Sequence, residues 1–291
     1  MHSIQRVLPS VLCLLFIAAP TRATDSKATV IALRGERGSA HNRELLKQRN
    51  TISRVVRPHP ETVVFVGDRV IPHFIDGGTW QTAITVVNLE NYATSFDIFF
   101  FTDSGTDFYV PIEGYGLVRA MHIALGTAGS FTFETTGTDP ILTSGWALLS
   151  QSNNDAVGAF AIFRSAPFGE QPQEAVVPAV NQFETHFVLP FDNSGQFVTG
   201  VALANPTLNS VVIPANIRNE QGQIIDTQTF SLGAYGHAAF ILEDEWTSTE
   251  GIRGTVEFLT SGFGVGALGI RANGRAYTSF SVMENLKWVA P

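Results

Sequence analysis

The sequence predicts an all-β protein built from two tandem antiparallel β-sandwich modules. Valine, isoleucine, phenylalanine and threonine are frequent and alternate with polar or small residues, as they do in half-buried strands. Glycine, asparagine, aspartate and proline recur at intervals of about 8 to 12 residues, the spacing of turns between short strands. A long pattern in the first half also returns in the second. These observations favour two-sheet modules of immunoglobulin-like or jelly-roll-like type.

The repeat is clearest in one predicted strand. Residues 80–88 (WQTAITVVN) are matched 117 positions later by residues 197–205 (FVTGVALAN). A second match, at an offset of 108, joins residues 157–162 (VGAFAI) to residues 265–270 (VGALGI). Because successive side chains of a strand point to opposite faces, the bulkier alternate residues are expected to face the core in both modules.

The first 23 residues are expected to be a secretory signal. Arg6 gives a positive start, residues 11–19 are apolar, and residues 21–23 form a small-residue cleavage site, which places the mature N-terminus near Thr24. No later stretch reaches the roughly 18 uninterrupted apolar residues of a membrane-spanning helix. We therefore expect an exported chain in the periplasm, outside the cell or at its surface. The single cysteine, Cys13, lies in the signal, so the modules must rely on ordinary cores.

Charge and composition divide the rest of the chain. Residues 24–60 hold eight basic and three acidic residues, whereas the complete chain has a formal net charge of −8. We expect a basic, flexible N-terminal arm at residues 24–60, a first module at 61–167, a Pro-rich linker at 168–185 and a second module at 186–291. Residues 174–180 also suit a last strand of the first module.

The uneven charge bears on the partners of the protein. An acidic body argues against nucleic acid and anionic membrane surfaces as partners of the modules. The basic arm is expected to be solvated and to carry one short helix at residues 42–49. The alternative is that this arm docks on the acidic modules or on an anionic cell-surface polymer. The oligomeric state is not predicted.

Features shared by both modules are expected to serve the fold, whereas features of only one module are candidates for function. Asn88 and Asn205 end the matched strands, and each is expected to hydrogen-bond the backbone that follows it. The dipeptides at residues 115–116 and 235–236 are a further match, Tyr-Gly in both modules. Counting from them to the next shared glycine gives the first module eleven additional residues, which we place near residues 126–137.

One face of a predicted strand carries only small residues, Val265, Ala267 and Gly269. Such a smooth face fits tight packing within a sandwich. It also fits close contact with the other module or with another subunit.

The paired patterns at residues 82–88 and 199–206 resemble tandem β-sandwich modules of secreted bacterial proteins of unassigned function. Residues 254–258 and 266–271 add to this resemblance, which covers most of residues 61–285. The motifs are packing and turn motifs, so the resemblance implies a fold and an extracellular setting and carries no catalytic residues. The longer middle section of the first module departs from it.

The sequence contains no standard catalytic or cofactor motif. H-E-x-x-H, G-x-S-x-G, the phosphate-binding glycine loop and a dinucleotide-binding loop are all missing. The histidines that follow the signal form no local metal pair. Two acidic turns, at residues 103–107 and 192–195, lack the further carboxylates of a calcium loop and are more simply hairpin turns. We therefore predict no catalytic residue, metal or cofactor, although carboxylates that converge in space stay open.

The candidate ligand-binding residues lie in a segment peculiar to the second module. Trp246 follows Glu243, Asp244 and Glu245. An exposed tryptophan beside carboxylates suits the binding of a sugar ring or a protein partner. The alternative is that Trp246 plugs the end of the sandwich, because tryptophan side chains are usually well buried.

The sequence favours a secreted, non-catalytic protein that acts in binding, adhesion or surface structure, with an extracellular glycan or a cell-surface protein as partner. The first alternative is an extracellular hydrolase acting on polysaccharide. A cleft with two facing carboxylates and a shifted pKa would favour the hydrolase, and a smooth sandwich with an exposed aromatic patch would favour the binding protein. The second alternative is an outer-membrane β-barrel, which the short predicted strands and the domain-sized repeat disfavour.

Overall fold

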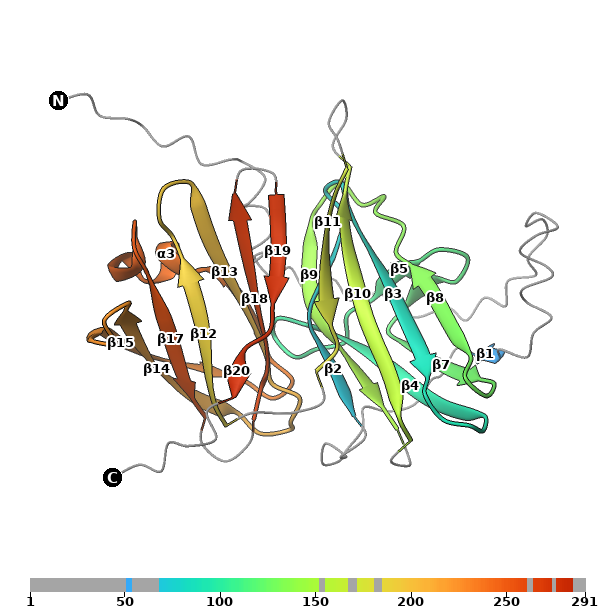
Figure 1. Cartoon of the computed structure of the whole chain (residues 1–291). Coiled ribbons are helices and arrows are strands. Elements are labelled where there is room, and N and C mark those ends of the chain that lie inside the picture. The colour runs from blue at the N-terminus through green and yellow to red at the C-terminus, as the bar shows by residue number, and fades with distance from the viewer. Residues whose placement is uncertain are drawn as a thin grey trace.

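The computed structural model of the chain describes residues 51–53, 68–151, 155–166, 172–180, 185–260, 264–273 and 276–284. This part of the chain is all-β, as predicted, and folds into several antiparallel sheets, none of which closes on itself (Figure 1). The expected signal sequence and the expected helix at residues 42–49 lie outside the described residues. Within the described part, no helix is both long and apolar enough to cross a membrane.

The first half of the described chain forms two main sheets and a separate hairpin. Its strands are β1 (Thr51–Ser53), β2 (Arg69–Asp76), β3 (Trp80–Asn88), β4 (Thr94–Thr102), β5 (Val110–Ile112), β6 (Gly116–Val118), β7 (Ala120–Leu125), β8 (Ser130–Glu134), β9 (Thr143–Ser150), β10 (Val157–Ser165) and β11 (Gln173–Pro178). The five-stranded sheet has the order β1-β7-β4-β9-β2, and the four-stranded sheet has the order β11-β10-β3-β8. The remaining two strands, β5 and β6, pair with each other, and Ile112 of β5 also forms an isolated bridge with Thr135.

The second half also forms a five-stranded and a four-stranded sheet. Its elements are β12 (His186–Asp192), β13 (Phe197–Ala204), β14 (Val211–Asn219), β15 (Ile224–Leu232), β16 (His237–Ile241), α3 (Leu242–Glu245), the 3₁₀ turn η1 (Thr247–Thr249), β17 (Arg253–Leu259), β18 (Gly266–Asn273), β19 (Ala276–Phe280) and β20 (Met283–Glu284). The sheet orders are β15-β14-β17-β12-β20 and β16-β13-β18-β19.

The two halves repeat one strand order. The strands β2, β3, β4, β7, β8, β9, β10 and β11 occupy the places that β12 to β19 occupy in the second half. Among the described strands, only β1, β20 and the β5–β6 hairpin lack such an equivalent. The repeat in the sequence therefore coincides with a repeat in the sheet topology.

Two strands fall outside the boundaries expected for the first module. Strand β1 lies in the expected N-terminal arm and pairs with β7 at the edge of the five-stranded sheet. Strand β11 lies in the expected linker and pairs with β10. Ala175 and Val177 of β11 are buried, whereas Val176 between them is exposed. This alternation is the pattern of an ordinary strand and agrees with the expectation that residues 174–180 suit a last strand of the first module.

Each half has a hydrophobic core that collects residues from both of its sheets. Ile71, Ile84 and Phe100 belong to the first core, and Ile213 and Phe258 belong to the second. Burial along β3 alternates residue by residue, with its bulky set inside. The predicted inward orientation of that set is confirmed, because Trp80, Ile84 and Val86 are at most 1% exposed.

Strand β13 is buried on both faces, because the second half packs against the first. Val201 and Leu203 belong to the second core, whereas Val198 and Ala202 of the same strand belong to the first core. Strand β18 is divided similarly, since Leu268 also contributes to the first core. The four-stranded sheet of the second half is thus covered from both sides.

The first half meets this sheet with the edges of its own sheets. Strand β2 lies against β13 and β18, and it is buried from Val70 to Asp76. Strand β11 lies beside β19, where the Ser279 hydroxyl donates to the Val176 carbonyl (Figure 1). An α-carbon substituent at Gly266 would come within 2.7 Å of Val70 Cγ1. The two halves are therefore in close contact along these strands.

The small-residue face of β18 packs within the second half. Val265 and Ala267 belong to the second core, and Gly269 is covered by the ring of Phe280 on the paired strand β19. A Cβ at Gly269 would lie only 2.3 Å from Phe280 Cε2, so glycine makes room for the ring. This outcome agrees with tight packing inside the module.

Asn88 and Asn205 close equivalent turns, as the sequence predicted. Asn205 is fully buried, and its amide group donates to the carbonyls of Asn209 and Gly233 at 2.7 Å each. Its Oδ1 accepts from the N–H of Thr207 at 3.0 Å. Asn88 makes the corresponding bonds in the first half. The structural interpretation of both residues is confirmed.

Replacing Asn205 by alanine is expected to lower the free energy of unfolding by about 3 kcal/mol, because several buried backbone groups lose their partner at once. Urea denaturation measures this change. The matched control is Asn209→Ala, since the Asn209 side chain is exposed and the turn uses its backbone N–H and carbonyl. Equal effects of the two substitutions would contradict the proposed cause.

The additional residues of the first half form the β5–β6 hairpin, and the expected insertion at residues 126–137 is wrong. Residues 126–129 make the same turn as residues 233–236, with Ala128 and Tyr235 at φ angles of 50° and 52°. The Tyr-Gly pair at 235–236 therefore corresponds to residues 128–129. Matching the Tyr-Gly pairs at 115–116 and 235–236 by identity was misleading, because the two equivalent turns share a backbone conformation and differ in their residues.

Candidate functional site

Trp246 is a core residue. Its side chain is 3% exposed and packs against Phe230, Phe240 and Phe258, with ring centroids 5.4 to 6.3 Å apart. A sugar-binding role needs an exposed ring face, so the prediction of an exposed tryptophan is wrong and the plug at the end of the second core is the correct interpretation. The three phenylalanines come from three strands, and only Phe240 lies close to Trp246 in the sequence, so a short window around residue 246 does not reveal the burial of the ring.

The three carboxylates next to Trp246 form the short helix α3. Glu243 is half-buried, whereas Asp244 and Glu245 are exposed. None of these residues lines either of the two clefts described below. The structure therefore does not assemble the four predicted residues around a common hollow.

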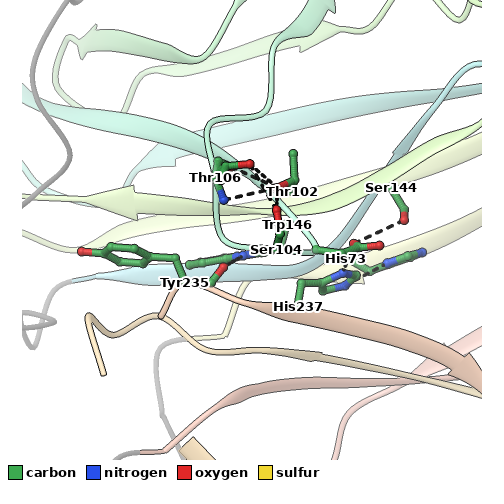
Figure 2. Close-up of polar contacts among 9 residues, drawn as sticks. His73, Thr102, Ser104, Thr106, Ser144, Trp146, Tyr235 and His237 are labelled. Atoms are coloured by element: carbon green, nitrogen blue, oxygen red, sulfur yellow. Dashed lines mark hydrogen bonds and ion pairs between the residues drawn. The ribbon is translucent and has the colours of Figure 1, made fainter. Parts of the chain in front are cut away.

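A buried histidine pair lies where the two halves meet (Figure 2). His73 of β2 is fully buried, and its Nδ1 lies 3.3 Å from Nε2 of His237 at the start of β16. The two rings stack with centroids 5.3 Å apart, and the Phe163 ring meets His73 edge-on. His237 Nδ1 in turn lies 2.7 Å from Asp103 Oδ1. Burial, and then the neighbouring His237, hold the pKa of His73 well below its usual value.

An aromatic stack continues this contact beside the histidines. The Phe101 ring lies between those of Trp146 and Tyr235, with centroid distances of 4.6 and 4.9 Å. Trp146 is fully buried and donates its indole N–H to the Tyr235 carbonyl at 2.8 Å (Figure 2). Gly105 packs so closely here that a Cβ would lie 2.0 Å from the Ala234 carbonyl oxygen. Hydrogen bonds and ring contacts therefore fix the two halves together.

The polar groups of this contact do not have the order of a catalytic triad. The Ser144 hydroxyl donates to Asp103 Oδ1 at 3.5 Å, and His237 contacts the same carboxylate oxygen. A Ser-His-Asp triad needs the imidazole between hydroxyl and carboxylate so that it can accept the hydroxyl proton. Here the carboxylate lies in the middle, so the arrangement joins the halves and does not activate Ser144.

The two acidic turns considered for calcium direct their carboxylates to different protein partners. Asp103 contacts His237, whereas Asp107 lies 3.3 Å from Arg119. Asp192 in the other turn pairs with Arg271 at 2.7 Å. Across the described ranges, no group of three or more acidic, histidine or cysteine side chains is arranged to hold a metal ion. The turn at residues 103–107 closes with a hydrogen bond from the Thr102 N–H to the Thr106 carbonyl, as a hairpin turn does. The turn at residues 192–195 joins β12 to β13, which lie in different sheets, so the hairpin prediction is wrong there.

A cleft of about 310 Å³ lies beneath the β5–β6 hairpin of the first half. Three segments build it: the end of β2, the insertion hairpin and the loop between β8 and β9. Its lining residues are Asp76, Phe108, Tyr109, Pro111, Leu117, Thr138, Asp139, Pro140 and Thr143. This volume lies at the lower end of the range for small-ligand sites.

Asp76 is the most unusual group of this cleft. The residue is 1% exposed, and its Oδ1 accepts a hydrogen bond from the N–H of Gly137 at 3.0 Å. Its Oδ2 is buried and has no hydrogen-bond partner in the described part of the chain. Burial raises the pKa of Asp76, the Thr135 hydroxyl and the Gly137 N–H partly oppose this, and the nearby Asp139 raises the pKa further.

The equivalent position of the second half is a satisfied neutral residue. Asn193 is fully buried, donates to Thr249 Oγ1 at 3.1 Å and accepts from the N–H of Thr199 at 2.9 Å. In the first half, the N–H of Thr82 binds Thr135 Oγ1 at 2.9 Å instead. Asp76 therefore does not bind the Thr82 N–H as Asn193 binds the Thr199 N–H, and it lies in the lining of the cleft.

Exchanging these two residues tests whether Asp76 costs stability. A raised folded-state pKa means that ionised Asp76 opposes folding above that pKa, and that the cost disappears as the pH falls below the unfolded value of 3.8. Asp76→Asn is therefore expected to raise the free energy of unfolding at pH 7 by about 1 kcal/mol, a gain that shrinks towards pH 4. The reciprocal Asn193→Asp should lower it by about 2 kcal/mol. Urea denaturation at both pH values checks these signs, and a loss of stability in Asp76→Asn at pH 7 would contradict them.

The second half has a cleft at the corresponding end, and its chemistry differs. The volume is about 720 Å³, and its lining includes Ser194, Asn219, Glu220, Ser248 and Arg253. Here the turn after β12 and the loop between β16 and β17 replace the turn after β2 and the loop between β8 and β9. Arg253 also pairs with Asp192, so the negative charge of the Asp192 carboxylate is compensated.

The fold and its sites define an all-β protein of two closely packed halves, with one cleft at the same end of each. No family model, no curated protein and no solved structure matches the chain. The comparison of the two halves within the chain is therefore the main guide to function. Sequence reasoning missed Asp76, although its alignment with Asn193 was a usable signal. It also missed His73 and His237, which lie 164 positions apart.

Proposed function

We propose that the protein is a secreted, non-catalytic binding protein made of two tandem β-sandwich modules that acts on a partner at or outside the cell surface. The observation that carries this proposal is the cleft beneath the β5–β6 hairpin with Asp76 inside it. The second half, which shares the strand order, has a satisfied asparagine at that position. A feature added to only one of two equivalent units, at a cost in stability, is typical of a binding site.

The arrangement of the halves supports a binding role. The histidine contact and the aromatic stack fix the two halves to one another, so the two clefts are held in one rigid frame. A rigid frame reduces the entropy that binding must offset. The repeated strand order supports the sandwich arrangement, with each pair of sheets enclosing one core.

A polysaccharide hydrolase is the second candidate, and a specific observation favours it. Asp76 and Asp139 line one cleft, and the pKa of Asp76 is raised by burial and by Asp139. Glycoside hydrolysis uses two carboxylates, one of which is kept protonated by such a shift.

Retention of the purified full chain on an array of glycans, cell-wall polymers and surface proteins tests the proposal. Asp76→Asn should lose retention of the bound component, whereas Glu174→Gln should keep it. Glu174→Gln is a suitable control because it removes one negative charge from an exposed side chain of β11. Absence of retention on every component, or equal loss in both variants, would count against a specific binding site.

The hydrolase candidate is checked with the same samples. Release of new reducing ends from an arrayed polysaccharide, abolished in Asp76→Asn and preserved in Glu174→Gln, would establish the hydrolase. Detection of the chain in the culture medium or the cell-surface fraction tests its export independently of either activity.

A further inference from the structure

We propose that the cleft beneath the β5–β6 hairpin binds a primary ammonium group on an apolar stem, which is the chemistry of a lysine side chain on a partner protein. Asp76 and Asp139 would hold the ammonium group, and Tyr109 and Leu117 would cover the stem. This proposal rests on the proposed binding function and names the ligand class of that site.

The carboxylates carry the first part of the argument. Asp76 lines the cleft, and its Oδ2 is a buried acceptor that makes no hydrogen bond within the described residues. Leaving such an oxygen without a donor costs free energy that a ligand can recover by supplying one. The missing partner is therefore a hydrogen-bond donor that enters from the cleft.

Charge selects the kind of donor. Asp139 lines the same cleft and disfavours the ionised form of Asp76, so the two carboxylates repel one another. The described lining contains no lysine, arginine or histidine that could offset this repulsion. Arg119, at the base of the insertion, pairs with Asp107. A neutral hydroxyl would supply a hydrogen bond only, whereas an ammonium group supplies both donors and positive charge.

The walls of the cleft select the stem. Phe108, Pro111, Leu117 and Pro140 give apolar surface, and Tyr109 adds an aromatic ring. Tyr109 and Leu117 are 49% and 57% exposed, and both belong to the segment that only the first half possesses. The aromatic ring of Tyr109 also attracts a cation, as the carboxylates of the same cleft do. An alkyl chain suits these walls better than a sugar ring, which has hydroxyl groups on most sides.

The test uses three small probes with the purified full chain and ligand-detected NMR. Nα-acetyl-lysine N-methylamide carries the proposed group, and the norleucine analogue keeps the stem but lacks the ammonium. Glucosamine carries an ammonium on a sugar ring. We expect the lysine probe to bind with a Kd on the order of 1 mM, and the norleucine probe to bind at least about tenfold more weakly.

Variants assign the binding to the cleft. Asp76→Asn and Asp139→Asn should each weaken binding of the lysine probe by about tenfold, and Glu174→Gln should leave it unchanged. Two separate carboxylate variants keep the test informative if one of them fails to fold. Tyr109→Ala should weaken binding of the lysine and norleucine probes alike.

Three results would overturn the proposal. These are no binding of the lysine probe to the folded chain, equal binding of the norleucine probe, or tighter binding of glucosamine, which would point to an amino sugar. Retention on the array that depends on Asp76, without binding of the lysine probe, would leave the proposed function standing and reject only the ammonium site. Binding of the lysine probe without retention on any component of the array would support the ammonium site and reject the proposed function.

Discussion

Replacement of Trp146 by alanine is expected to lower the free energy of unfolding by about 4 kcal/mol, the largest effect of any single substitution considered for this protein. The side chain is fully buried, stacks on Phe101 and donates a hydrogen bond to the Tyr235 carbonyl. The substitution removes the ring, leaves a cavity and deprives a carbonyl of the second half of its donor.

The same substitution should also separate the unfolding of the two halves. Because Trp146 joins them, we expect one urea transition in the wild type and two transitions in Trp146→Ala, followed by circular dichroism and tryptophan fluorescence. Trp146→Phe is the graded control, since it keeps a six-membered ring against Phe101 and loses the smaller ring of the indole together with its N–H. Trp246→Ala is the control for ring loss inside one core, because Trp246 packs only among residues of the second half. A single unchanged transition in Trp146→Ala would contradict its role at the contact.

Mild acid is expected to destabilise the contact between the halves through His73. The pKa of buried His73 is held well below its usual value of 6.5, so the folded protein keeps this residue neutral while the unfolded chain takes up a proton. The resulting stability is complete above pH 6.5 and is lost as the pH falls from 6.5 towards the folded-state pKa. One proton changes the free energy of unfolding by about 1.4 kcal/mol per pH unit at most.

Unfolding free energies measured between pH 7.5 and pH 5 test this expectation. The titratable groups that bear on His73 are His237 in direct contact and Asp103 beyond it. His73→Asn places a side-chain amide near the position of Nδ1 and cannot take up the proton. The slope of its unfolding free energy against pH should therefore be shallower than that of the wild type by about one proton equivalent. Identical slopes in the two proteins would assign the acid sensitivity to other groups.

Strand positions were predictable because they depend on neighbours in the sequence. Alternation along β3 and β13 and the turn asparagines Asn88 and Asn205 appear in windows of fewer than ten residues. Strand β11 was visible in the same way at residues 174–180, although the prolines, glycine and glutamines of residues 165–185 favoured a linker. The insertion was misplaced because Tyr235 was matched by identity, whereas the turn keeps a backbone conformation that Ala128 also adopts.

The candidate site was less predictable, because its properties depend on distant segments. The exposure of Trp246 is decided by three phenylalanines that come from three different strands. The role of Asp76 requires both the insertion hairpin and the loop that carries Asp139. An alignment of the two halves places Asp76 opposite Asn193, and that change from amide to acid was the one sequence signal of the cleft.

The two-sided burial of β13 has a consequence for how the chain acquires its structure. In vectorial synthesis the first half is completed while the strands that cover β2 and Trp146 have not yet been made. Until β13 and β18 arrive, an apolar surface of the first half stays bare, and either half produced alone would carry such a surface permanently. The repeated unit is therefore one half of the chain, whereas the unit that folds is the pair of halves.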